Sequence, residues 1–209
     1  MTEDPYRRVA NIYDRLFESL TSGLRLLGVR MFLPKKGMKV LDVGCGTGIH
    51  LDMYRRFNCN LYGIDTSPSM LDVARSRLGD KAELHLGDAT QMPYKKDTFD
   101  LILCMLALHE MDQLTRILVL SEIRRVLKTD GHILLVDYHT GHVRPVKGWL
   151  TKLIVVLSEV AAGRRHFRNY RHFISSNGLP RLIEESQLVE KKTKVVADGN
   201  IALYLVRTK

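Results

Sequence analysis

Short apolar segments alternate with amphipathic segments along most of the chain. The apolar segments, which predict β-strands, cover residues 38–43, 60–64, 82–86, 99–105 and 132–137. Helical spacing of apolar residues, together with helix-start signals, predicts helices over 6–17, 22–32, 49–57, 67–78 and 113–127. Strands that alternate with helices in this way are typical of an α/β fold with a mostly parallel sheet.

The end of the chain has a different pattern. A short helix at 179–185 is followed by two predicted strands, 189–196 and 201–206, which Asp198-Gly199-Asn200 can join as a hairpin turn. We therefore expect a Rossmann-like sheet of seven strands, with helices on both faces and an antiparallel C-terminal hairpin. No linker divides the chain, so residues 1–209 are predicted to form a single domain. It would include N-terminal helices at about 5–33 and a basic helical insert after the fifth strand, at about 139–176.

The composition is ordinary for a globular protein, with 45% hydrophobic and 26% charged residues, and it excludes an intrinsically disordered chain. The longest apolar run, 101–108, is too short to span a bilayer. No signal-type segment is found near the N-terminus, so we expect a cytoplasmic protein. The three cysteines form no C-x-x-C pair, and the sequence therefore predicts neither a disulfide framework nor a metal site.

The pattern that carries chemistry begins where the first strand ends. Asp42 is followed by Gly44, Gly46 and Gly48, and the next strand ends at Asp65. Glycines in this position let the backbone turn and approach a ligand, and an acidic residue after the next strand can bind ribose hydroxyls. These features predict an adenosine-containing cofactor. A dinucleotide motif would need its last glycine one position later, and the lysine of a P-loop is missing.

The segment from Asp42 to Gly48 closely resembles the first motif of class I S-adenosylmethionine-dependent methyltransferases. The resemblance continues at 63–65, 87–89 and 99–102, and it covers about residues 6–137 and the final strand pair. The chain also resembles the subgroup of C-methyltransferases of ubiquinone and menaquinone biosynthesis, known as methyltransferase type 11. S-adenosyl-L-methionine is the cofactor that this resemblance implies.

The resemblance also implies which residues contact the cofactor. The methionine part of the cofactor would be lined by Gly44, Cys45, Gly46 and Gly48, with Asp42 beneath. Asp65 would bind the ribose, and Cys104 would lie near the sulfonium. The adenine would be surrounded by Thr66, Met70, Asp88 and Ala89. Tyr13 resembles a tyrosine that caps the cofactor in the quinone-type subgroup, which makes it a candidate catalytic residue. An aromatic residue at helical spacing is equally typical of a buried helix face.

His109 is the main candidate on the acceptor side, because it follows the central strand 99–105. It could remove a proton from an acceptor hydroxyl or orient the acceptor, and it could also be a loop histidine that is hydrogen-bonded to the backbone. Asp137-Tyr138-His139, after the fifth strand, faces the same edge and has the same alternatives.

The predicted insert holds much of the positive charge. The chain has 32 Lys and Arg residues against 23 Asp and Glu, and residues 139–172 contain seven of these cations and one acid, Glu159. Within the insert, Val146, Trp149, Leu150, Leu153, Leu157 and Val160 recur at helical spacing. The insert is therefore either a lid whose basic face is solvated or a surface for an anionic amphipathic substrate or membrane.

These observations favour a methyltransferase that acts on a small or amphipathic acceptor of the quinone or phospholipid-headgroup type, with possible peripheral contact to an anionic membrane. A nucleic-acid methyltransferase is the alternative that the positive charge suggests. The fourth strand ends in Cys104-Met105-Leu106-Ala107, however, which lacks the Pro-Pro motif of enzymes that methylate exocyclic amines. A cofactor-binding regulatory protein without catalysis is a third hypothesis.

Overall fold

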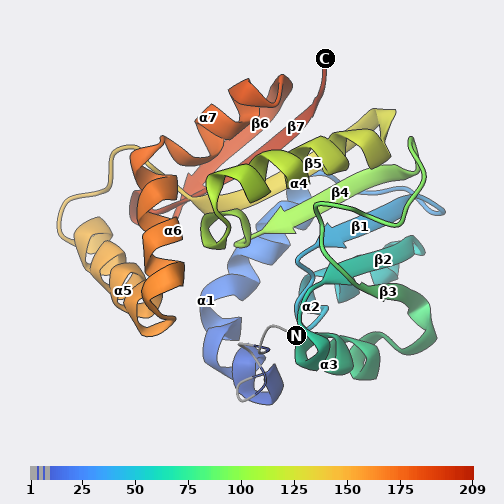
Figure 1. Cartoon of the computed structure of the whole chain (residues 1–209), viewed down its shortest axis with the longest axis horizontal. Helices are drawn as coiled ribbons and strands as arrows, with labels where there is room; N and C mark the ends of the chain where they lie inside the picture. Colours follow the sequence, from blue (N-terminus) through green and yellow to red (C-terminus); the bar gives the residue numbers. More distant parts are fainter. Residues whose placement is uncertain (1–3, 5–6, 8–9) are drawn as a thin grey trace.

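The computed structural model describes residues 4, 7 and 10–209, apart from the side chains of 11–20. Seven strands form one sheet in the order β3-β2-β1-β4-β5-β7-β6 (Figure 1). They are β1 (Lys39–Val43), β2 (Asn60–Asp65), β3 (Ala82–Leu86), β4 (Phe99–Met105), β5 (Leu127–Tyr138), β6 (Leu188–Val196) and β7 (Ile201–Thr208). The first five strands pair in parallel, and β7 runs antiparallel to both β5 and β6. The predicted fold class is confirmed.

Helices cover both faces of the sheet. They are α1 (Ala10–Met31), α2 (Ile49–Asp52), α3 (Pro68–Leu78), α4 (Gln113–Val126), α5 (Lys147–Ala161), α6 (Arg164–Ser175) and α7 (Gly178–Glu185). One core layer packs α4 and α7 on the sheet, and the other packs α1, α2 and α3 on the opposite face. Because both faces of β4 are covered, its run of apolar residues is almost completely buried.

The N-terminal part differs from the prediction of two helices. Residues Ala10–Met31 form one continuous helix, α1, across the expected break before Ser22. A single glycine at position 23 costs only about 1 kcal/mol inside a helix, which is too little to end it. The helix expected over 49–57 is also shorter, because α2 ends at Asp52 and a 3-10 turn, η1 (Arg55–Phe57), follows.

Two further boundaries were predicted wrongly. Strand β5 begins at Leu127, five residues before the expected start, because the predicted turn at 129–131 is extended and the β4–β5 pairing shifts register there. The insert contains two helices, α5 and α6, where one amphipathic helix was expected. They are separated by Gly163, whose φ of +112° is a conformation that side chains rarely allow. The C-terminal hairpin turns through a 3-10 turn, η4 (Ala197–Gly199).

Candidate functional site

The carboxyl ends of β1, β2 and β3 are tied together by backbone hydrogen bonds. The amide of Gly44 donates to the carbonyl of Ile64 at 2.9 Å, and the amide of Gly87 donates to the carbonyl of Asp65 at 3.0 Å. The amide of Gly46 donates to Oδ2 of Asp65 at 2.8 Å. The glycine loop, the predicted ribose ligand and the segment 87–89 are thus neighbours, as the sequence predicts for a cofactor edge.

The glycine loop leaves room for a ligand. Gly44, Gly46 and Gly48 all have positive φ, which favours glycine. A Cβ atom built on Gly46 would have no described atom within 4 Å, whereas one on Gly48 would lie 2.8 Å from the Leu78 side chain. Gly46 therefore borders open space, and a cofactor could lie directly against its backbone.

Two carboxylates lie at this edge. Burial raises the pKa of Asp42 to about 8, and the nearby Asp65 carboxylate adds to this effect, while Arg25 opposes it. Burial also raises the pKa of Asp65, although the amides of Ser67 and Gly46 donate to its oxygens and act in the other direction. Asp42 is therefore largely protonated at neutral pH.

The other predicted cofactor residues differ in exposure. Thr66 and Asp88 are exposed and Ala89 is half-buried, so all three are accessible beside the ends of β2 and β3. Met70, by contrast, is buried near the start of α3. Cys45 is buried against Gly63. A Cβ atom built on Gly63 would lie 2.8 Å from the sulfur of Cys45.

Two predicted residues remain. Cys104 pairs with Val43 at the end of β1, next to the glycine loop, and is buried in the core layer that includes α4. Tyr13 falls in α1, but its side chain lies outside the described part of the chain.

One contact at this edge was not predicted from the sequence. The Asp4 carboxylate accepts hydrogen bonds from the amide of Ser69 at 3.1 Å and from the hydroxyls of Ser69 and Ser67 at 2.7 and 2.8 Å. These contacts hold Asp4 at the first turn of α3, near Asp65. The Asp4 side chain therefore lies at the cofactor edge.

A second cluster of polar side chains lies beyond the ends of β4 and β5. His109 belongs to a 3-10 turn, η3 (Leu108–Glu110), and its Nδ1 lies 2.7 Å from Oδ1 of Asp137. The His109 amide also donates to Oδ2 of Asp137, at 3.2 Å. Because β4 and β5 are adjacent parallel strands, their ends bring this buried pair together. The sequence placed both residues at this edge and did not predict their contact.

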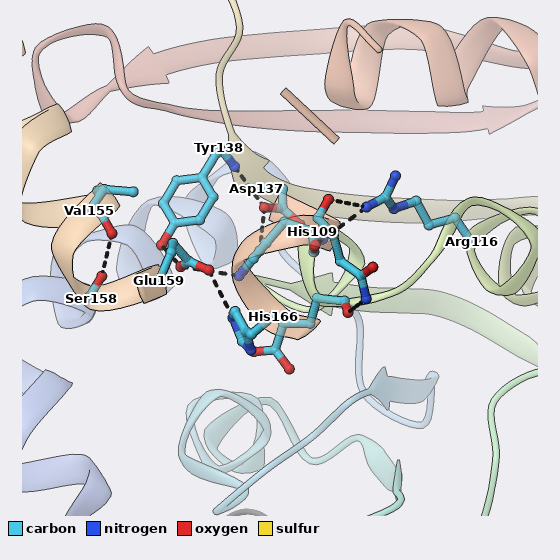
Figure 2. A network of polar contacts seen from close by, with 10 residues as sticks. His109, Arg116, Asp137, Tyr138, Val155, Ser158, Glu159 and His166 are labelled. Carbon is cyan, nitrogen blue, oxygen red and sulfur yellow. Dashed lines mark hydrogen bonds and ion pairs between the residues drawn. The ribbon is translucent and has the colours of Figure 1, made fainter. Parts of the chain in front are cut away.

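The insert adds two members that sequence reasoning missed. Figure 2 shows Glu159 of α5 between Tyr138, His109 and His166 of α6. The Tyr138 hydroxyl donates to Oε1 of Glu159 at 2.8 Å, and this oxygen lies 3.6 Å from Nε2 of His109. Oε2 of Glu159 lies 2.8 Å from Nε2 of His166. Among the described contacts of this network, His139 does not take part.

The charges in this cluster shift one another's pKa. Burial alone would lower the pKa of His109, but the Asp137 carboxylate outweighs it and raises the pKa to about 9. Burial opposes ionisation of Glu159, but His166, His109 and Tyr138 together lower its pKa. The His109 ring is therefore protonated at neutral pH when nothing else is bound to it.

Arg116 fixes the insert to this edge. Its side chain is 1% exposed, its Nε donates to the carbonyl of Leu108 and one Nη donates to the carbonyl of Asn169, each at 2.8 Å. The Asn169 side-chain amide in turn donates to the carbonyl of Glu110 at 2.6 Å. Helix α6 and the turn that holds His109 are thus joined by buried hydrogen bonds.

Comparison with known proteins identifies part of this chain. Residues 41–135 match a family model described as "Methyltransferase domain". Residues 41–135 of this chain therefore carry a methyltransferase domain. A curated relative, the demethylmenaquinone methyltransferase of Clavibacter sepedonicus, is 30% identical over 68% of this chain, and the match spans 60% of the relative's length.

Solved structures agree on the fold. A Haloferax volcanii protein, solved in complex with the Trm112 methyltransferase activator, has a TM-score of 0.73. It is 18% identical, and the match covers 100% of this chain and 99% of that one. A SAM-dependent methyltransferase of Aquifex aeolicus has a TM-score of 0.62 at 18% identity, with 88% and 89% covered.

The methyltransferase domain presents an unusual surface on α5. This helix buries only Gly148 and Glu159, and its apolar stripe points away from the domain. Seven large apolar side chains are each more than half exposed, namely Val146, Trp149, Leu150, Leu153, Ile154, Leu157 and Val160. We call these seven residues the α5 outer face. The predicted stripe is real, but it does not pack on the domain as an ordinary lid helix would. Within the described residues, no helix is long and apolar enough to cross a bilayer.

Proposed function

We propose that this protein transfers a methyl group from S-adenosylmethionine to a small amphipathic acceptor of the quinone or phospholipid-headgroup type. The supporting observation is that a single helix, α5, has both chemistries that such an acceptor needs. Its inner side contributes Glu159 to the polar cluster at the ends of β4 and β5, and its outer face is apolar. A polar head could bind beside the cluster while an apolar body lies along the insert.

The cofactor supplies an activated methyl group, so the chain's own residues mainly have to align the acceptor and exclude water. A protonated His109 held between Asp137 and Glu159 is a hydrogen-bond donor and a poor base at neutral pH. This supports an orienting role for His109, one of the two roles considered from the sequence. The Glu110 carboxylate lies 3.9 Å from Nε2 of His166, and these two side chains are more accessible than His109, so they would contact the acceptor directly.

A methyl-transfer screen tests this function. The protein would be incubated with S-adenosylmethionine carrying a radiolabelled methyl group and with demethylated quinols, phospholipid extracts, small amines, DNA or RNA. We expect label in a quinol or lipid fraction. Label in DNA or RNA alone would favour the nucleic-acid alternative, and cofactor binding without any transfer would favour a regulatory protein.

The α5 outer face supports a second proposal, contact with an anionic membrane surface that holds the acceptor. Lys147 and Lys152 lie on the same helix, and the only acid of residues 139–175, Glu159, is buried. Three arginines of α6, at positions 164, 168 and 171, line a surface hollow and form no ion pair within the described residues. An apolar helix face with cationic flanks is suited to the boundary between lipid head groups and acyl chains.

Vesicle co-sedimentation tests this contact with a matched pair of variants. Leu157→Ser removes an apolar side chain that is 59% exposed on α5, and Leu114→Ser removes one that is 67% exposed on α4. We expect binding to anionic vesicles that weakens with salt, weakens further in Leu157→Ser, and is unchanged in Leu114→Ser. Charge reversal at Arg164, Arg165 and Arg168 should weaken it as well. Equal binding by both leucine variants would contradict the proposal.

A further inference from the structure

The polar cluster beyond β4 and β5 has the donor set of a metal site. His109, Glu159 and His166 each offer one ligand atom, and these atoms all lie within 4.8 Å of one another. Donors on one tetrahedral zinc ion lie about 3.3 Å apart, since each is about 2.0–2.2 Å from the metal. Oε1 of Glu159 lies 3.6 Å from Nε2 of His109, and Oε2 lies 2.8 Å from Nε2 of His166, so each histidine lies near this distance from one carboxylate oxygen. Only small side-chain movements would be needed to bind an ion.

The atoms behind these donors have the arrangement that orients metal ligands. Asp137 engages Nδ1 of His109 and thereby leaves Nε2 directed into the cluster. The Asp137 carboxylate is itself held by the Tyr138 amide, which donates to it at 2.8 Å. The Tyr138 hydroxyl donates to Oε1 of Glu159, while the buried Oε2 faces Nε2 of His166 at 2.8 Å. Glu159 is 4% exposed, so this oxygen is directed at His166 and has no access to water.

The charge balance of the cluster also favours a divalent cation. Three carboxylates, those of Asp137, Glu159 and Glu110, surround the two imidazoles, and the Glu110 carboxylate lies 3.9 Å from Nε2 of His166. Arg116 is the one guanidinium bonded to this turn in the described structure. A divalent cation bound here would place its positive charge among these carboxylates, and buried charges in proteins are usually paired or bound to metal.

We propose that His109, Glu159 and His166 bind a divalent cation of the Zn²⁺ class. Two imidazoles and one carboxylate form a ligand set that zinc and neighbouring transition metals accept. The side chains of His166 and Glu110 are 19% and 33% exposed, so a fourth position is open toward solvent. A site with three protein ligands and an open position is of the catalytic type rather than the structural type. Cation binding itself does not depend on the acceptor proposed above.

The test uses the purified full chain after treatment with a chelator. Zn²⁺ is titrated by calorimetry, and Co²⁺ is titrated by visible absorption, which reports its ligand geometry. We expect one equivalent of either ion and a rise in melting temperature with Zn²⁺, because the ion binds the folded state. Glu159→Gln and His166→Ala should each weaken binding by about 100-fold or more, and Asp137→Asn by about 10- to 100-fold. His142→Ala, an exposed histidine of the insert outside the cluster, is the matched control.

Several results would overturn the proposal. The proposal is overturned if wild-type protein binds less than one equivalent of both ions. It is also overturned if both Glu159→Gln and His166→Ala still bind the ions as wild type does. If one of these variants fails to fold, the Co²⁺ spectrum of the wild type decides, because a hexa-aqua-like spectrum excludes imidazole ligands. If the protein binds neither ion but still transfers methyl groups, the metal proposal fails and the proposed methyltransferase function stands.

Discussion

Replacing Asp42 with Asn should stabilise this protein, and the gain should grow with pH. In the folded chain, burial and the neighbouring Asp65 raise the pKa of Asp42 to about 8, compared with the ordinary aspartate value of 3.8 in the unfolded chain. The folded state therefore holds this proton more tightly than the unfolded state. The stability that comes from this tightly held proton is fully present below pH 3.8 and is lost as pH rises toward 8. Asn has nearly the same shape and cannot ionise, so it escapes this loss.

The size of the effect follows from the linkage between protonation and folding. Each pH unit between the two pKa values costs the wild type about 1.4 kcal/mol in free energy of unfolding. Between pH 5 and pH 7.5, the advantage of Asp42→Asn over wild type should grow by about 3 kcal/mol. The attraction between Asp42 and Arg25 is the main force acting in the opposite direction.

Urea unfolding at pH 5, 6, 7 and 7.5 measures this difference for wild type and variant. Asp80→Asn is the matched control, since its side chain is 87% exposed and its substitution should give no pH-dependent difference. A difference between wild type and Asp42→Asn that stays constant across this range would refute the reasoning. It would mean that Arg25 keeps Asp42 ionised throughout and that burial does not dominate.

Three further predictions concern the two edges of the sheet. Asp65→Ala should weaken binding of S-adenosylhomocysteine by about 1.5–3 kcal/mol in calorimetry, because hydrogen bonds to a charged acceptor are lost, while NAD should not bind wild type at all. Gly46→Ala should lower the free energy of unfolding by only about 1 kcal/mol, from its positive φ, yet strongly reduce cofactor affinity because the new methyl group fills the open space beside the loop. His109→Ala should slow methyl transfer about 100-fold at unchanged cofactor affinity, because the acceptor loses the donor that orients it, and a rate within twofold of wild type would remove His109 from the acceptor site.

The sequence predicts the cofactor edge well because its signals are local. Gly44, Gly46 and Gly48 are needed for backbone geometry wherever they stand, and Asp65 ends a strand whose neighbours follow from the parallel topology. Ser67 was expected to begin α3, and its hydroxyl does accept from the amide of Met70. Such features depend on residues a few positions apart and on the fixed direction of the strands.

The acceptor edge could be predicted only in part, because its members come from four separate elements. His109 and Asp137 follow adjacent strands, so their meeting was foreseeable. Glu159 and His166 lie on helices of the insert, and nothing in the strand pattern says where those helices dock. A single acid within an apolar helix was the available signal. A buried charge needs partners, and Glu159 could have been matched to the histidines on that ground.

The orientation of α5 links the two proposed roles of the insert. Periodicity identifies an apolar stripe but cannot say which way it points, and here the polar contacts of Glu159 decide it. Turning the stripe inward would pull this carboxylate out of its network and leave His109 and His166 without it. The same rotation of the helix that assembles the cluster therefore exposes the α5 outer face. One orientation of α5 both exposes the α5 outer face and assembles the polar cluster, so a surface that binds the outer face also favours the assembled cluster. By linkage, an ion or acceptor that binds the assembled cluster must then strengthen binding of that surface by the same factor.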